Sequence, residues 1–117
     1  MKSRNVIESF KYAISGIIYA FKTQRNLKIH FAAATGVLLL SPFFNFSRAE
    51  LLLLFFTVTL VIVCELFNTA IEIVVDMVAH TYHPLAKLAK DVAAGAVLVS
   101  AINALVVAYI LFISRMK

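Results

Sequence analysis

Four polar side chains recur at spacings of three, four and four residues in an apolar stretch of the chain: Glu65, Asn68, Glu72 and Asp76. An α-helix turns about 100° per residue, so these side chains would lie within roughly 80° of one another on one face. The fourteen residues before Glu65 carry no charge, which predicts that this acidic stripe lies on a membrane-embedded helix. Carboxylates at such depth are costly, so they should face protein, water or a metal ion.

The acidic stripe has the composition of a metal-dependent phosphoryl-transfer site. Three acids on one face repel one another unless a cation joins them, and Mg²⁺ is a hard ion that takes carboxylate oxygens. A metal, the nearby Lys90 and a carboxylate that could take a proton from an alcohol are the parts that such a site needs. The sequence contains no Walker loop and no soluble kinase signature. The alternative is a stripe of hydrogen bonds between helices in a non-enzymatic membrane scaffold.

The composition favours a membrane protein. Of the 117 residues, 62% are hydrophobic and 15% are charged, which is more apolar than a soluble domain of this length needs to be. The net charge is +5, and the basic residues lie near the ends of the apolar segments. That placement suits the anionic headgroups of a lipid bilayer and not a nucleic acid.

Apolar periodicity predicts an all-α membrane protein with a single domain over residues 1–117. We expect an amphipathic surface helix over residues 1–28 and transmembrane helices over 29–46, 51–79 and 92–113. Residues 80–90 are expected to form the loop between the second and third spans. In the third span, small residues every four positions allow another helix to approach closely: Ala96, Ser100, Ala104 and Ala108. His30, at the entrance to the first span, is expected to be an interfacial side chain.

The distribution of basic residues predicts the orientation in the cell membrane. Six basic residues precede the first span, and Lys87 and Lys90 follow the second, whereas the opposite side carries three: Arg48, Arg115 and Lys117. Basic residues accumulate on the cytoplasmic side. We therefore expect a multi-pass protein of the cytoplasmic membrane, with its N-terminus, the 77–91 segment and the acidic stripe on the cytoplasmic side, where ATP is available.

Two motifs carry a resemblance to a known family. The run ELFNTAIEIVVD (residues 65–76), followed by HPLAKLAKD (83–91), resembles the small prokaryotic diacylglycerol kinases, whose pattern is close to E-x-x-N-x-A-I-E-x-x-V-D followed by A-K-D. The chain length, the surface helix, the three spans and Tyr12 with Gly16 agree with that family. The run RNLKIH (25–30) is similar to the Gram-positive branch, whose members phosphorylate undecaprenol.

The resemblance implies a homotrimer whose active sites are shared between neighbouring subunits and use MgATP as the phosphate donor. By position, it makes Glu65 the general base on the lipid hydroxyl, and it makes Asn68 a brace for the catalytic site. Glu72 would bind the metal and Asp76 would orient the nucleotide. Further nucleotide contacts are implied for six residues: Tyr12, Thr81, Tyr82, His83, Lys90 and Asp91.

This chain departs from the family pattern at two positions. Gln24 stands where the family usually has a second metal-binding glutamate, and its amide oxygen can coordinate a metal but supplies no charge. Asn5 aligns with the N-terminal arginine that contacts the lipid substrate, and Arg4 beside it can take that role. The acidic stripe is unaffected by either departure.

The expected function is therefore a lipid kinase that transfers the γ-phosphate of MgATP to undecaprenol and forms undecaprenyl phosphate. Diacylglycerol is the alternative acceptor, since both lipids present a primary hydroxyl at the membrane interface, and its product would be phosphatidic acid. The third possibility is a membrane scaffold without enzymatic activity. Such a scaffold would tolerate the replacement of Glu72 by glutamine.

Overall fold

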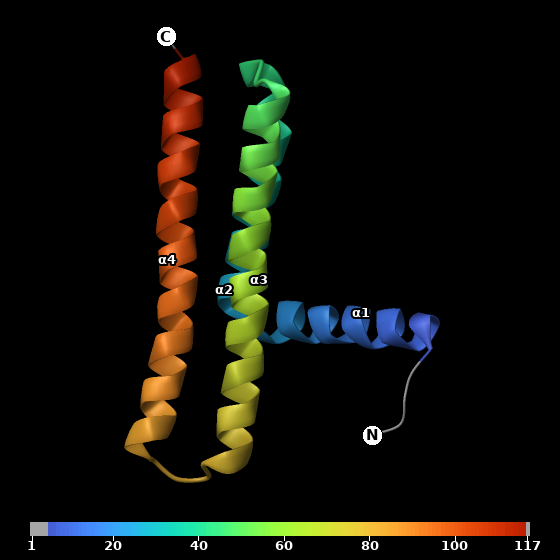
Figure 1. Ribbon diagram of the computed structural model, residues 1–117, viewed down its shortest axis with the longest axis vertical. Coiled ribbons are helices and arrows are strands. Elements are labelled where there is room, and N and C mark those ends of the chain that lie inside the picture. Colours follow the sequence, from blue (N-terminus) through green and yellow to red (C-terminus); the bar gives the residue numbers. More distant parts are fainter. Residues whose placement is uncertain (1–4, 117) are drawn as a thin grey trace.

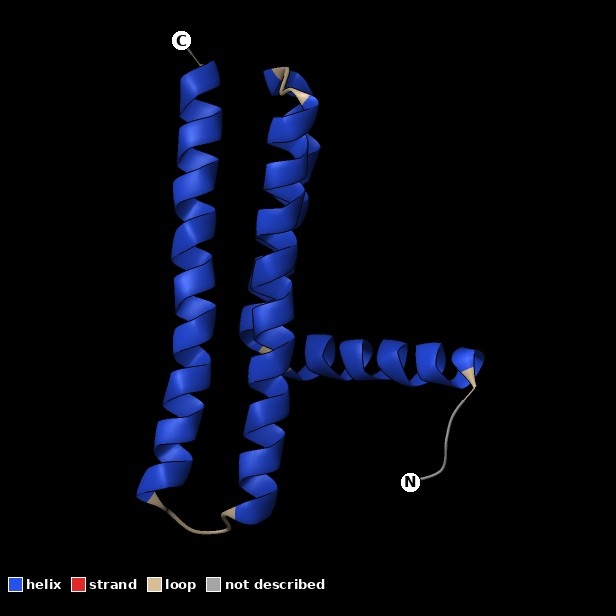
Figure 2. Ribbon diagram, in the orientation of Figure 1, coloured by secondary structure: helices blue, strands red, loops and turns tan. Residues whose placement is uncertain are grey.

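The computed structural model describes residues 5–116, and helices make up nearly all of this range (Figures 1 and 2). The elements are α1 (Val6–Thr23), α2 (Arg25–Leu40), the short 3₁₀ helix η1 (Ser41–Phe44), α3 (Arg48–Val78) and α4 (Pro84–Arg115). Helices α2, α3 and α4 run alongside one another, and α1 leaves this bundle sideways (Figure 1). No β-strand occurs within residues 5–116, which agrees with the all-α prediction.

Three helical segments are long and apolar enough to cross a membrane: Arg25–Phe44, Arg48–Val78 and Pro84–Arg115. This finding confirms the expectation of three spans behind an N-terminal helix. At 1.5 Å per residue, α3 and α4 are each about 46–48 Å long, whereas the hydrocarbon core of a bilayer is about 30 Å thick. Both helices must therefore extend beyond the hydrocarbon at one or both ends.

Helix α1 begins at a capping box and ends at a sharp turn. The Asn5 side chain accepts a hydrogen bond from the backbone N–H of Glu8 at 2.8 Å, and the Glu8 carboxylate accepts one from the Asn5 N–H at 3.5 Å. Gln24 has an extended backbone conformation, with φ −105° and ψ 110°, so the chain changes direction there. As a result α2 begins at Arg25, four residues before the expected start of the first span.

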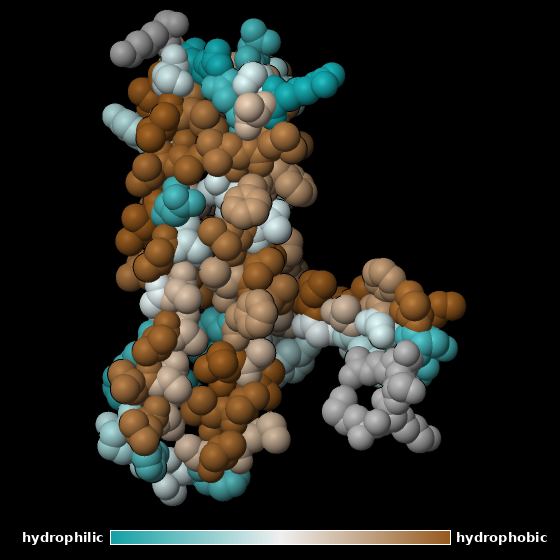
Figure 3. Space-filling model, in the orientation of Figure 1, coloured by the Kyte–Doolittle hydropathy of each residue, from teal (hydrophilic) through white to brown (hydrophobic). Residues whose placement is uncertain are grey.

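The side chains of α1 suit a helix that lies along a membrane surface. Its large apolar residues are exposed, among them Val6, Ile7 and Phe10. In Figure 3 the hydrophobic side chains of this helix lie mainly on the side toward which α2 rises. An amphipathic helix with that orientation buries its apolar face in the interface of the membrane that α2 crosses.

The turn between α3 and α4 is shorter than the sequence predicts. Pro84 occupies the first turn of α4, and His83 caps the helix by accepting a hydrogen bond at Nδ1 from the Leu85 N–H at 3.1 Å. Residues 84–90, which were expected in a loop, are therefore helical. Proline favours this outcome because its fixed φ suits the first helical position. The correction places Lys87, Lys90 and Asp91 on a regular helix next to the end of α3.

The end of the bundle remote from the acidic stripe is closed by polar and aromatic contacts. Arg115 of α4 forms an ion pair with Glu50, which also belongs to the capping box that starts α3. The Phe112 ring packs edge-on against Phe44 and Phe46, with ring centroids 4.7 and 5.2 Å apart. These contacts join α4 to the η1 turn and set the alignment of α3 against α4.

One column of α3 side chains is buried within the bundle: Leu54, Thr57, Val61, Glu65 and Thr69. Its spacing of three and four residues is the spacing of one helix face. The column is apolar at its start and meets the acidic stripe at Glu65. Past that point the stripe becomes steadily more accessible, since Asn68 and Glu72 are half-buried and Asp76 is exposed.

Candidate active site

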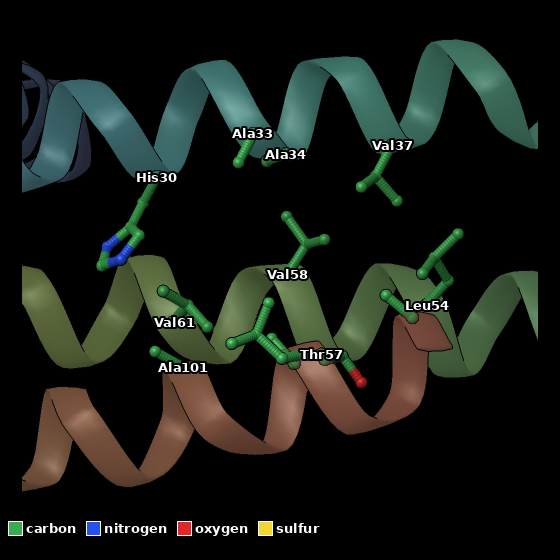
Figure 4. Close-up of a pocket in the computed structure, with 12 residues that line it drawn as sticks. His30, Ala33, Ala34, Val37, Leu54, Thr57, Val58, Val61 and Ala101 are labelled. Carbon is green, nitrogen blue, oxygen red and sulfur yellow. The ribbon is translucent and has the colours of Figure 1, made fainter. Parts of the chain in front are cut away.

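Glu65 is the most deeply buried acid among the described residues, with 2% of its surface exposed. His30 of α2 reaches toward it, and the His30 Nδ1 atom lies 3.0 Å from Glu65 Oε1. Figure 4 shows the His30 ring directed from α2 toward α3, beside Val61. Neither atom has an aligned hydrogen bond to any described residue, so the contact is a close approach of two polar groups in a buried setting.

Asn68 adds a second buried acceptor one helical turn further along. Its Oδ1 atom is buried and, like Glu65 Oε1, has no hydrogen-bond partner within residues 5–116. The neighbouring Thr69 hydroxyl is already used, because it donates to the backbone carbonyl of Glu65 at 2.9 Å. Buried acceptors without donors are uncommon and costly. The Asn68 oxygen, beside the carboxylate of Glu65, is suited to receive a hydroxyl donor from a bound molecule.

An apolar cavity of about 230 Å³ lies between α2, α3 and α4 (Figure 4). His30 and Val61 line it where α3 approaches Glu65. Much of the remaining wall consists of alanines, which leave space between the helices: Ala33, Ala34, Ala101, Ala104 and Ala108. His30 is the one titratable side chain of this lining. The cavity thus offers apolar space within the bundle, and the histidine that borders it is also in contact with Glu65.

The other end of the acidic stripe is open and charged. Asp76 Oδ1 lies 2.6 Å from Lys90 Nζ, in an ion pair between α3 and α4 whose side chains are 67% and 39% exposed. A pocket of about 440 Å³ is lined by Asp76, Lys90 and the Thr81–His83 turn, among others. The structure therefore brings five of the residues expected to contact the nucleotide to one pocket. Asp91 pairs instead with Lys87 at 2.6 Å.

Glu72 lies between the two ends of the stripe. It is half-buried and lies seven residues, about two helical turns, beyond Glu65 on the same face of α3. Its position is thus suited to link the buried carboxylate to the open pocket. Within the part of the chain that is described, no three His, Cys, Asp or Glu side chains are grouped so that they could hold a metal ion.

The donor types that Mg²⁺ takes in a phosphate-transfer site are nonetheless present on this chain. Magnesium is held there through one or two carboxylates, and water and phosphate oxygens complete its shell. Glu72 supplies such a carboxylate, and the amide oxygen of Gln24 is a second hard donor. Gln24 lies at the α1–α2 turn, where its backbone N–H donates to Ala20 at 2.8 Å.

The residues expected on the N-terminal helix are not part of the open pocket in the single chain. Tyr12 lies on α1 and Asn5 caps it, and neither lines the pocket at Lys90. Arg4 lies outside the described residues. In Figure 1 helix α1 extends away from the α3–α4 turn. The single chain therefore assembles the residues of the α3–α4 hairpin and leaves those of α1 apart from them.

The comparison with known proteins supplies the family. A model of the prokaryotic diacylglycerol kinases matches residues 11–112. The chain belongs to this family. The match includes the whole acidic stripe together with Lys90 and Asp91, and it supports the expectation of a membrane-embedded lipid kinase.

Three relatives carry two different names. A diacylglycerol kinase of Synechocystis is 46% identical over 104 residues, covering 88% of this chain and 59% of the relative. The undecaprenol kinase of Bacillus subtilis is 38% identical over 109 residues, covering 93% of this chain and 89% of the relative. The diacylglycerol kinase of Haemophilus influenzae is 32% identical over 96 residues, which are 82% of this chain and 81% of that protein. Family membership therefore leaves the acceptor lipid open.

His30 is the neighbour of Glu65 that the sequence does not reveal. A single histidine at the start of a span is typical of an interfacial side chain, and nothing in the spacing along one helix links it to Glu65. The structure gives it a buried partner on another helix. The available signal was its place in the RNLKIH run, six residues after Gln24.

Proposed function

We propose that this protein is an ATP-dependent kinase that transfers the γ-phosphate of MgATP to the hydroxyl of undecaprenol and forms undecaprenyl phosphate. The observation that carries the proposal is the arrangement of the acidic stripe in a member of this kinase family. Its buried end holds the Glu65 carboxylate and the Asn68 Oδ1 atom, which has no hydrogen-bond partner among the described residues, and its exposed end borders an open pocket with a lysine. A lipid alcohol and a nucleotide need these two environments.

At the buried end, Glu65 is proposed as the general base. Its carboxylate accepts the proton of the alcohol, and the alcohol oxygen forms a bond to the γ-phosphorus. The bond from that phosphorus to the β–γ bridging oxygen breaks, and ADP leaves. The proton passes from Glu65 to water after the product departs. Asn68 Oδ1, buried and without a hydrogen-bond partner among the described residues, orients the reacting hydroxyl beside Glu65. Burial keeps competing water away from this step.

At the exposed end, the open pocket is proposed to hold ATP. The Lys90 ammonium is placed to contact phosphate oxygens, and its ion pair with Asp76 keeps it at the pocket wall. His83 and the Thr81–Tyr82 turn form another part of the wall. Tyr12 and Asp91 are proposed as further nucleotide contacts. Because lysine binds phosphate as a point charge, small shifts of this exposed pair are compatible with binding.

Glu72, with the amide oxygen of Gln24, is proposed to hold Mg²⁺ between these two ends. When bound, the ion offsets the negative charge of the phosphate oxygens. Gln24 contributes no charge of its own, so Glu72 carries the electrostatic part of the metal affinity. The partial burial of Glu72 strengthens its attraction for a cation relative to a fully solvated carboxylate.

Undecaprenol is preferred to diacylglycerol as the acceptor for two reasons. The RNLKIH run resembles the Gram-positive branch, and its His30 contacts the proposed base. The chain is also 38% identical to the Bacillus undecaprenol kinase but 32% identical to the Haemophilus diacylglycerol kinase, and it covers more than four fifths of each. Diacylglycerol remains the second candidate, since the Synechocystis relative has the higher identity.

We also propose that the protein acts as a homotrimer with its catalytic sites on the cytoplasmic side. Beyond Glu65, the α3 surface carries an exposed apolar stripe: Phe67, Ile71, Val74 and Val78. A second copy that covers this stripe would replace lipid contacts by close helix–helix packing next to the proposed nucleotide pocket. Neighbouring subunits could also bring Tyr12, Gln24 and the lipid-contacting Arg4 and Asn5 to a shared site.

The test is a phosphate-transfer assay in detergent micelles with labelled MgATP. Undecaprenol and diacylglycerol are offered separately and then in competition, and the Glu65→Ala variant serves as the blank. Preferential labelling of undecaprenol supports the proposal, and a preference for diacylglycerol replaces the acceptor and keeps the mechanism. The absence of transfer to any long-chain alcohol would exclude the kinase function.

A further inference from the structure

His30 and Glu65 form a contact between two helices that the proposed reaction has so far not used. The imidazole Nδ1 lies 3.0 Å from the carboxylate Oε1, and the Glu65 side chain is 3% exposed. Taking a carboxylate out of water is costly unless a partner compensates it. His30 is the one described side chain with an ion-pair contact to Glu65, so the orientation of this carboxylate depends on a residue of α2.

His30 also borders the apolar cavity between α2, α3 and α4 (Figure 4). It therefore lies between the proposed base and the apolar cavity of the bundle. A side chain that only filled space beside this cavity would not need a polar ring. Its Nδ1 atom lies 3.0 Å from Glu65 Oε1, and it has no aligned hydrogen bond to any described residue, Glu65 included.

We propose that His30 is a positioning residue for Glu65. Its Nδ1 atom lies 3.0 Å from Oε1, and this approach fixes the orientation of the carboxylate so that the other oxygen, Oε2, is turned toward the acceptor hydroxyl. This inference rests on the proposed kinase function and adds a specific residue to it. The physical basis is that a displacement of about 1 Å at a reacting group can cost up to about 100-fold in rate.

Two substitutions separate positioning from packing. His30→Asn places an amide nitrogen near the present site of Nδ1, whereas His30→Leu keeps apolar bulk and removes the polar contact. Positioning predicts that His30→Leu lowers kcat about 10- to 100-fold and that His30→Asn stays within a few-fold of the wild type. The KM for MgATP should be unchanged in both, because Lys90 lies at the other end of the stripe. Thr35→Val, on the exposed side of the same helix, is the matched control.

A double-mutant cycle completes the experiment. If His30 acts through Glu65, the His30→Leu substitution should cause little further loss in a Glu65→Ala background, since effects of residues that work together are not additive. A His30→Leu variant as active as His30→Asn, or an equal loss with and without Glu65, would overturn the inference. In either case an active wild type leaves the kinase function intact. A wild type that labels no lipid alcohol would instead overturn the kinase function, and this inference with it.

Discussion

The two ends of the acidic stripe lie on one face of one helix but in opposite environments. Glu65 is buried against His30 of α2, whereas Asp76 forms an ion pair with Lys90 while two thirds of its side chain remains exposed. The difference arises because α2 covers α3 near Glu65, and only the start of α4 and the short turn flank Asp76. One run of sequence therefore supplies both a shielded carboxylate and a solvated one.

The contrast between the buried and the exposed end of the acidic stripe shows how one helix can serve an apolar and a charged substrate. A carboxylate that is shielded from water interacts strongly with the few groups around it, because the local dielectric is low. An exposed pair is screened by water and salt and contributes little to stability. The buried end is suited to proton transfer from a lipid alcohol, and the open end is suited to the exchange of a charged nucleotide.

The largest effect should come from the buried end. Replacing Glu65 by alanine should lower turnover by roughly 10²- to 10⁴-fold, which is typical of a lost acid–base group, and should leave the KM for MgATP nearly unchanged. Steady-state kinetics with saturating lipid alcohol measure both constants. Glu50→Gln, which alters an acid at the far end of the same helix, is the matched control. A Glu65→Ala variant with normal turnover would refute its role as the base.

Between the two ends, Glu72→Gln should weaken MgATP binding and turnover together. The substitution keeps an oxygen donor but removes the charge that attracts Mg²⁺. Titrations of activity with Mg²⁺ at fixed ATP should show a higher half-maximal metal concentration. Gln24→Glu adds a charge and should shift the same curve in the opposite direction. Unchanged metal dependence in both variants would remove these residues from the metal site.

At the open end, Lys90→Met should raise the KM for MgATP by about tenfold, which is the scale of one lost hydrogen bond to a charged group. Its kcat at saturating nucleotide should fall much less than that of the Glu65 variant. Arg48→Met is the matched control, because that basic side chain is exposed at the opposite end of α3 and lines no part of this pocket. A loss confined to kcat would show that Lys90 acts in the chemical step. It would contradict the proposal that the open end binds the nucleotide while the buried end transfers the proton.

The smallest effect is expected far from both ends. Arg115→Gln removes the ion pair with Glu50, which is partly exposed and remote from the acidic stripe. Kinetic constants should stay at the wild-type values, and the midpoint of thermal unfolding in detergent should change little. A clear fall in turnover would indicate that the alignment of α3 against α4 controls the catalytic end.

Much of the fold follows from local pattern. The apolar runs predict three spans, and the amphipathic spacing before them predicts a further helix; the structure has three such apolar helices behind an N-terminal helix. The start of α4 was the main error, because the sequence between His80 and Lys90 resembles a loop until the capping role of His83 and the position of Pro84 are recognised. Helix ends depend on such single contacts and are therefore less predictable than helix cores.

The sequence was sufficient to place Glu65, Asn68, Glu72 and Asp76 on one face, because residues on a single helix keep their relative angles whatever surrounds them. The tertiary structure was needed to show which of them is buried and which is open, since that depends on where α2 and α4 cross α3. The same holds for the contact between His30 and Glu65, which are 35 residues apart in the chain and meet only when two helices pack. Spacing along one helix carries no information about the alignment between helices, and that alignment determines the surroundings of each acid.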